Sequence, residues 1–65
     1  MNVILNGKNI NIKENATILD LIEFANVKSK MFVVEKNKEI IYKENYCTIL
    51  QENDGIEIVG FFGGG

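Results

Sequence analysis

The sequence contains no histidine and no tryptophan, and Cys47 is its single cysteine. Because zinc and other transition-metal sites depend mainly on histidine and cysteine ligands, we expect no such site. The Cys-His and Ser-His pairs of nucleophilic catalysis cannot be assembled either. Cys47 cannot form an internal disulfide, and we interpret it as a small packed hydrophobic side chain, with a reactive thiol as the alternative.

Other absences narrow the class of protein further. The glycine-rich loop motifs that cradle phosphates are missing, and a formal net charge of −2 is unfavourable for binding nucleic acid. No apolar run approaches the roughly 20 residues of a membrane span, and the start at Met1 lacks the basic segment and apolar core of a signal peptide. We therefore expect a cytoplasmic protein with no nucleic-acid or membrane partner. We also expect it to be bound or acted upon by another protein, and not to be an enzyme itself.

The residues that are present suit one small folded domain. Of the 65 residues, 46% are hydrophobic and 25% are charged. This balance is typical of a compact globule rather than a disordered segment.

The N-terminal residues predict a β-hairpin. Apolar segments at 3–5 and 10–12 flank Asn6-Gly7, a pair favoured in two-residue type I′ turns because both positions need a positive φ. We expect Lys8 and Asn9 to be looser residues between the turn and the second strand.

A single helix is predicted next. Thr17 is a suitable N-cap with Asp20 three residues later, and the helix is expected to end near Asn26-Val27. Its apolar face is expected to comprise the positions at helical spacing: Ile18, Leu19, Leu21, Ile22 and Ala25.

The second half of the chain predicts further strands. β-branched and aromatic residues form short runs separated by polar turns. The expected elements are a strand at 31–34, a turn at 35–38, a strand at 39–41, an irregular connector at 42–46, a brief extended piece at 48–50, a turn at 53–55 and a last strand at 56–61.

The order β-β-α-β-β-β favours a two-layer α+β domain of the β-grasp (ubiquitin-like) type. One helix can cover only one face of a mixed sheet of four or five strands. A right-handed crossover brings the later strands back beside the first hairpin. In the β-grasp fold the last strand lies parallel to the first, at the sheet centre. We expect the domain to span 1–61 and residues 62–65 to form a flexible C-terminal glycine tail.

The uncovered face of this sheet is the first candidate site. If Ile56 and Ile58 face the helix, Val59 and Phe61 point the other way, as Ile4 does in the first strand. An exposed apolar cluster of this kind indicates a docking surface. The alternative is that connector residues cover it. Phe62 is a further candidate, either as a core residue or as an exposed anchor.

The glycine run Gly63-Gly64-Gly65 is the second candidate site. Glycine has no Cβ, so such a segment can enter a slot that is too narrow for other residues. It ends on a carboxylate that is ionised at neutral pH. We expect it to thread into a partner's active site; the alternative is a frayed terminus.

Taken together, these segments resemble the ThiS family of ubiquitin-like sulfur carrier proteins of thiamine biosynthesis. The resemblance covers essentially the whole chain and depends on its length combined with several segments. These are Val3-Ile4-Leu5-Asn6-Gly7, Thr17-Ile18-Leu19-Asp20-Leu21-Ile22, Val33-Val34-Glu35-Lys36-Asn37, Asp54-Gly55-Ile56-Glu57-Ile58-Val59 and the closing glycines.

The resemblance implies that the carboxylate of Gly65 is adenylated and then converted to a thiocarboxylate. The implied partners are an E1-like adenylating enzyme (ThiF- or MoeB-like), a cysteine desulfurase that supplies sulfur as a persulfide, and a ThiG-like thiazole synthase. ATP and magnesium belong to the adenylating enzyme, so the carrier itself is expected to hold no cofactor and no metal. We expect the free protein to be a monomer.

Three alternatives remain open at this point. A MoaD-like small subunit of molybdopterin synthase would use the same tail chemistry. A ubiquitin-like modifier would form isopeptide bonds with lysines instead of carrying sulfur. A plain β-grasp interaction module would have an inert tail.

Overall fold

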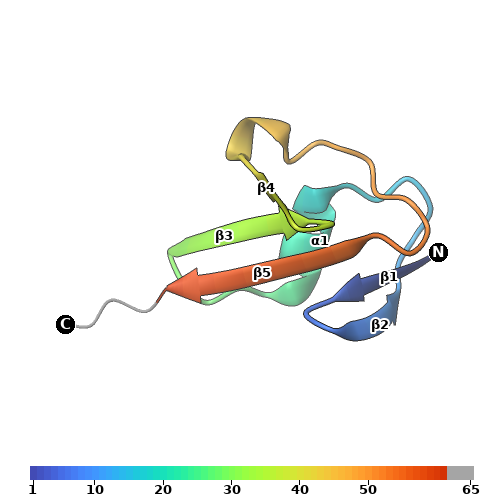
Figure 1. Ribbon diagram of the computed structural model, residues 1–65, viewed down its shortest axis with the longest axis horizontal. Coiled ribbons are helices and arrows are strands. Elements are labelled where there is room, and N and C mark those ends of the chain that lie inside the picture. The colour runs from blue at the N-terminus through green and yellow to red at the C-terminus, as the bar shows by residue number, and fades with distance from the viewer. Residues whose placement is uncertain (62–65) are drawn as a thin grey trace.

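A computed structural model describes residues 1–61, and the predictions made for Phe62, Gly63, Gly64 and Gly65 lie outside this range. The chain forms a five-stranded mixed sheet with one α-helix on one face (Figure 1). The strand order is β2-β1-β5-β3-β4. The elements are β1 (Asn2–Leu5), β2 (Lys8–Asn11), α1 (Ile18–Ala25), β3 (Met31–Lys36), β4 (Glu39–Ile41), the 3₁₀ turn η1 (Lys43–Asn45) and β5 (Gly55–Phe61).

The last strand lies at the centre of the sheet, as predicted. β5 runs parallel to β1, with Leu5 opposite Ile56. On its other side it pairs with β3 in antiparallel direction over the whole length from Met31–Phe61 to Lys36–Ile56. In Figure 1 both strands cross in front of α1, so the helix covers one face and leaves the other open. The predicted two-layer β-grasp architecture is therefore confirmed.

The N-terminal hairpin is tighter than the sequence suggested. Asn6 and Gly7 both have positive φ, 49° and 83°, as a type I′ turn requires. Leu5 is already opposite Lys8, and Ile4 is opposite Asn9. The expectation that Lys8 and Asn9 are loose was wrong, because a two-residue turn returns the chain to the sheet at once.

Helix α1 begins at a complete capping box. The Asp20 backbone N–H donates to Thr17 Oγ1 at 3.2 Å, and the Thr17 N–H donates to Asp20 Oδ2 at 2.9 Å. The helix ends at Asn26, which adopts a left-handed conformation. The prediction for Leu19 was wrong: it is 44% exposed, whereas Leu21 is completely buried. One helix of eight residues presents only a narrow stripe to the sheet, and Leu19 lies beside that stripe.

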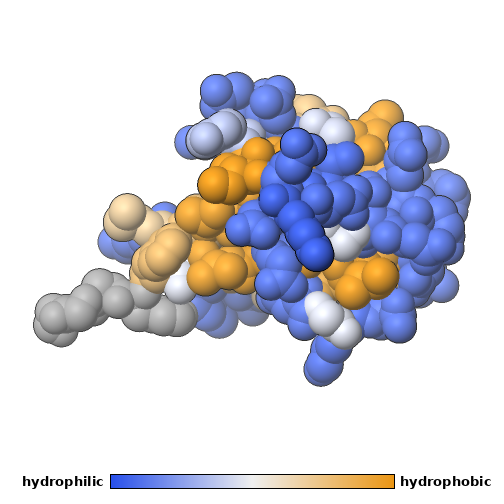
Figure 2. Space-filling view, in the orientation of Figure 1, coloured by the Kyte–Doolittle hydropathy of each residue, from blue (hydrophilic) through white to orange (hydrophobic). Residues whose placement is uncertain are grey.

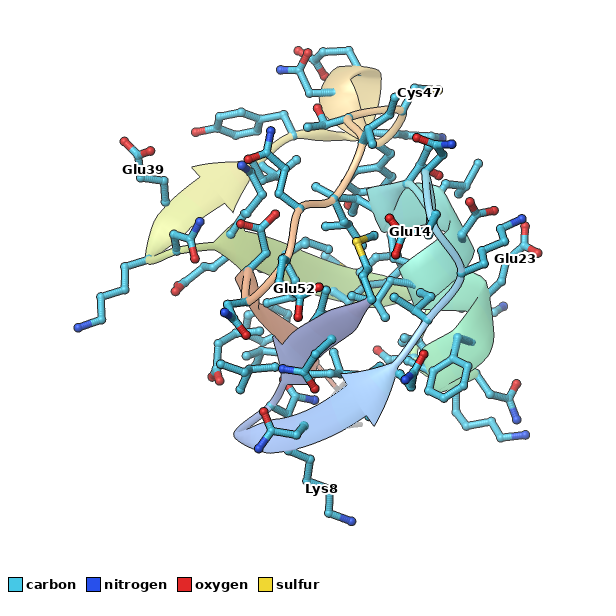
Figure 3. All side chains as sticks on the ribbon, turned by 90° about the vertical axis from the view of Figure 1, so that its right-hand side faces the viewer. Lys8, Glu14, Glu23, Glu39, Cys47 and Glu52 are labelled. Carbon is cyan, nitrogen blue, oxygen red and sulfur yellow. The ribbon has the colours of Figure 1, made fainter. Side chains whose placement is uncertain are left out.

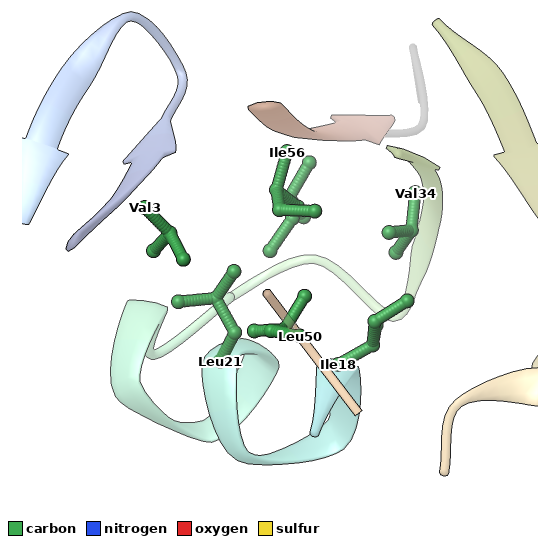
Figure 4. Packing of buried hydrophobic residues seen from close by; sticks show 7 residues of the cluster. Val3, Ile18, Leu21, Val34, Leu50 and Ile56 are labelled. Carbon is green, nitrogen blue, oxygen red and sulfur yellow. The ribbon is translucent and has the colours of Figure 1, made fainter. Parts of the chain in front are cut away.

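The core lies between α1 and the covered face of the sheet (Figure 4). It combines residues from β1, α1, β3 and β5 with one residue from the connector after η1. The members are Val3, Ile18, Leu21, Val34, Leu50, Ile56 and Ile58. Leu50 reaches this core because Thr17 and Ile49 form an isolated bridge beside the start of α1.

A polar cluster fixes the start of β5. Asp54 is only 8% exposed, and its carboxylate accepts hydrogen bonds from the Gln51 N–H at 2.8 Å and from Asn37 Nδ2 at 3.1 Å. Asn37 Oδ1 in turn accepts the Gly55 N–H at 2.9 Å. These contacts join the β3–β4 turn to the first residue of β5, a role that the sequence did not reveal for Asp54.

The capping box predicts a pH dependence of stability. The hydrogen bond from the Thr17 N–H lowers the pKa of Asp20 below its ordinary value of 3.8, with a smaller contribution from the Lys13 ammonium. A carboxyl group whose pKa is lowered on folding stabilises the fold above its unfolded-state pKa and loses this effect as the pH falls through the folded-state value. We therefore expect Asp20→Asn to be less stable than the wild type at pH 7, with the difference shrinking between about pH 5 and pH 2.

Urea unfolding monitored by circular dichroism at several pH values measures this effect. Glu23→Gln, at an exposed position on the same helix, is the matched control. A stability difference between Asp20→Asn and the wild type that stays constant down to pH 2 would contradict the assignment.

Candidate functional site

The open sheet face carries an apolar surface beside the end of β5. Val59 and Phe61 are 48% and 54% exposed, and they lie opposite Val33 and Met31 of the neighbouring strand. Met31 is itself 70% exposed. We call Met31, Val33, Val59 and Phe61 the open-face patch. Figure 2 shows hydrophobic surface on this face near the C-terminal end of β5.

Ile4 lies on the same open face but not within this patch. Ile4 is opposite Gly55, whereas Val59 comes four residues later in β5, about 13 Å further along the strand. Glu35 and Glu57, which are opposite each other, occupy the space between. Ile4, Val59 and Phe61 therefore lie on the predicted face of the sheet, but they do not form the one continuous cluster that was predicted. The reason is that β1 pairs only with the beginning of β5.

Met31 and Val33 were missed as members of the patch. Both lie in a segment that was correctly predicted as a strand, and they alternate with Phe32 and the buried Val34. The missing information was the register of β3 against β5, which brings the pairs Val33–Val59 and Met31–Phe61 together.

Ser29 anchors the end of β5. Its hydroxyl oxygen lies 2.6 Å from the carbonyl oxygens of Met31 and Phe61, and it accepts the Met31 N–H at 3.3 Å. The loop can approach this closely because residue 60 is glycine: a Cβ at Gly60 would lie 2.9 Å from the Cβ of Ser29. The last residue of β5, Phe61, is thereby tied to the loop after α1.

Cys47 does not pack in the core. It is a free and exposed cysteine between η1 and the Thr17–Ile49 bridge, and Figure 3 shows it at the periphery of the molecule. The interpretation of Cys47 as a packed hydrophobic side chain was wrong, because the core position in this connector is taken by Leu50.

Residues 1–61 contain no group of three or more histidine, cysteine, aspartate or glutamate side chains placed to hold a metal ion. None of the helices in this range is long and apolar enough to span a membrane.

A five-stranded mixed sheet with one helix on one face defines a small α+β domain of the β-grasp (ubiquitin-like) class. The model of the ThiS family matches residues 3–65, and the chain belongs to this family. It is 48% identical to the sulfur carrier protein ThiS of Bacillus subtilis, over 94% of this chain and 96% of that protein.

Similarity extends to longer proteins and to solved structures. The whole chain is 35% identical to a segment of the thiazole synthase of Paramagnetospirillum magneticum, and it spans about 20% of that protein's length. The crystal structure of the thiamine biosynthesis protein ThiS from Geobacter metallireducens matches over 100% of both chains, with a TM-score of 0.81 and 28% identity. A solution structure of a thiamine biosynthesis protein from the same organism matches all of this chain and 88% of that chain, with a TM-score of 0.78 and 29% identity.

The contact between Gly60 and Ser29 yields a stability prediction. Gly60→Ala places a methyl group against the Ser29 Cβ, and we expect a loss of about 1–3 kcal/mol in the free energy of unfolding. In a Ser29→Gly background the same substitution should cost clearly less, because the opposing Cβ is gone.

Gly55→Ala is the matched control in the same strand, since a Cβ there would meet only Asn37 Oδ1 at an ordinary 3.6 Å. Urea unfolding of the single and double variants, alongside the wild type, measures all these terms. If Gly60→Ala lowered the free energy of unfolding equally in the wild-type and Ser29→Gly backgrounds, the close approach of Ser29 would not be what restricts residue 60 to glycine.

Proposed function

We propose that this protein is the sulfur carrier of thiamine biosynthesis, and that its C-terminal carboxylate at Gly65 is the group that carries the sulfur. The observation with the greatest weight is the 48% identity to the B. subtilis sulfur carrier protein ThiS, which extends over nearly the full length of both chains. The sequence ending Gly63-Gly64-Gly65 supplies the small residues and the carboxylate that this role needs.

The chemistry proceeds in two steps. A carboxylate is a poor acyl donor because its oxygen is a poor leaving group. In the first step the Gly65 carboxylate attacks the α-phosphate of ATP, pyrophosphate leaves, and an acyl-adenylate forms. In the second step a sulfur nucleophile attacks the acyl carbon and AMP leaves. Sulfide gives the thiocarboxylate directly, whereas a persulfide gives an acyl disulfide, which a thiol then cleaves to release the thiocarboxylate and a disulfide. The reacting atoms must be held at near-attack distance in a site that excludes water, and the partner enzyme supplies this site together with ATP and magnesium.

We propose that an E1-like adenylating enzyme docks on the open-face patch. This surface is exposed, apolar and adjacent to the end of β5, where Ser29 fixes Phe61. Binding there would place the following glycine segment at the enzyme's active site. Phe62 belongs to the proposed docking residues as well, whereas Ile4 lies on the same sheet face beyond Glu35 and Glu57 and outside the patch.

A thiazole synthase is the proposed acceptor of the sulfur. Thiazole synthases of two organisms contain a segment that is 35% identical to this entire chain. A carrier segment and a synthase within one polypeptide support the idea that the two act in succession. In this account the carrier acts as a substrate and not as a catalyst, and it receives its sulfur from a persulfide on a cysteine desulfurase. The free protein is a monomer in the cytoplasm.

Intact-mass spectrometry tests the proposed chemistry. The protein is incubated with a ThiF- or MoeB-like adenylating enzyme, ATP, magnesium and sulfide. We expect a mass gain equal to the replacement of one oxygen by sulfur, and no gain in a variant that lacks Gly65. A parallel reaction with the enzyme's native carrier shows that the adenylating enzyme is active. An unchanged mass of this protein under those conditions would refute the proposal. Conjugates to lysine side chains would favour a ubiquitin-like modifier.

Charge substitution tests the docking surface. Phe61→Asp should weaken binding to the adenylating enzyme roughly tenfold or more, because it places a charge within an apolar contact. Phe24→Asp is a well-matched control, since Phe24 is 59% exposed, compared with 54% for Phe61, and lies on the helix layer. Isothermal titration calorimetry gives both affinities. Equal losses in the two variants, or a loss only in Phe24→Asp, would place the interface elsewhere.

A further inference from the structure

The edge of β3 is open where β4 ends. In the hairpin register, Lys36 is opposite Glu39 and Val34 is opposite Ile41. Continuing this register would place Lys43 opposite Phe32. However, β4 stops at Ile41, and Lys43 begins the η1 turn. The N-terminal half of β3 therefore has a partner strand on the β5 side only.

The backbone of Phe32 faces this open edge. The Asn37 N–H donates to the Gly55 carbonyl at 2.7 Å, so the odd-numbered residues of β3 direct their backbone groups toward β5. The even-numbered residues direct theirs toward β4. Within the described residues, the Phe32 N–H and carbonyl point to a position that no strand occupies.

A groove of about 520 Å³ follows this edge. Three consecutive residues line it, Met31, Phe32 and Val33, although their side chains alternate between the two faces of the sheet. A groove that touches all three must follow the strand edge itself. Figure 2 shows hydrophobic surface extending across the open face toward the η1 turn.

The two walls of the groove are apolar on both faces of the sheet. On the helix side, Phe32 stacks on Tyr46, with ring centroids 6.4 Å apart and an interplanar angle of 15°. On the open side, Met31 and Ile40 are 70% and 51% exposed. An added strand would place its alternating side chains against one wall and then the other.

The charge at the groove has one sign. Lys30 and Lys43 line it, and no aspartate or glutamate of the described residues does. This is unusual in a chain with nine acidic and seven basic residues. The ligand that fits therefore has apolar residues at its centre and carboxylates beside them.

We propose that this groove binds an extended, acidic-flanked apolar segment of a partner protein, which adds as a short strand along Met31–Val33. The Phe32 N–H and carbonyl supply main-chain hydrogen bonds, the apolar walls receive alternate side chains, and Lys30 and Lys43 select carboxylates. This binding function is additional to sulfur transfer and does not depend on Gly65.

NMR titration of the ¹⁵N-labelled full chain tests the proposal. The probe is a terminally blocked heptapeptide with a Val-Ile-Val centre and two acidic residues on each side. We expect saturable shifts of the amide signals of residues 30–33 and 41–43, with a downfield shift for Phe32 as its N–H gains an acceptor. The same peptide with lysines in place of the acidic residues should bind with an affinity at least about fivefold lower. N-methylation of the peptide's central isoleucine should abolish binding, because it removes the main-chain donor.

Charge reversal in the protein completes the test. Lys30→Glu/Lys43→Glu should reverse the preference between the two peptides. Lys8→Glu/Lys38→Glu changes the net charge by the same amount and should leave the preference between the two peptides unchanged. Lys8 lies on β2 at the far end of the molecule from η1 (Figure 3). Absence of shifts at millimolar peptide, shifts at the β2 edge, or equal affinity for the two peptides would overturn the proposal. None of these outcomes bears on adenylation of Gly65, which the mass measurement tests separately.

Discussion

The parallel pairing of β1 with β5 is the contact on which the rest of this structure depends. It places the first and last strands of the described chain side by side at the sheet centre, with Leu5 opposite Ile56. Because β5 then has β1 on one side and β3 on the other, its covered face can bury Ile56 and Ile58 beneath the single helix. The same geometry leaves its alternate residues, Val59 and Phe61, on a face that has no second layer. The apolar surface at the C-terminal end of β5 thus follows from having one helix for five strands.

Asparagine side chains hold this arrangement together at its turns. Asn6, Asn15, Asn26, Asn37 and Asn53 all have positive φ, which asparagine tolerates better than most residues. Two of them also bond to the central strand. Asn6 Oδ1 accepts the Ile58 N–H at 2.9 Å, just beyond the last β1–β5 pair. Asn37 Oδ1 accepts the Gly55 N–H at the strand's beginning. The same residues therefore form the turns and fix the strand that leads to the proposed sulfur-carrying end.

The architecture was predictable from local signals, whereas the extent of the surface was not. Asn6-Gly7 predicted a hairpin, Thr17 and Asp20 predicted a helix start, and the single helix required a two-layer fold. The position of Met31 and Val33 beside Val59 depends on strand register, which is set by long-range pairing and not by local pattern. The exposures of Leu19 and Cys47 were mispredicted for a related reason, since competition with Leu21 and Leu50 for a small core is decided in three dimensions.

The central claim is that the open face of the β5–β3 pair is the surface that partners recognise. A methyl cross-saturation experiment tests it most directly, with the chain deuterated except at its labelled methyl groups and bound to a protonated adenylating enzyme whose protons are saturated. The account predicts signal loss at the methyl groups of Val33, Val59 and Met31, and retained signal at Leu19, which is exposed on the helix layer. Signal loss at Leu19 with intact signals from Val33 and Val59 would show that the helix layer is recognised, and would contradict the account.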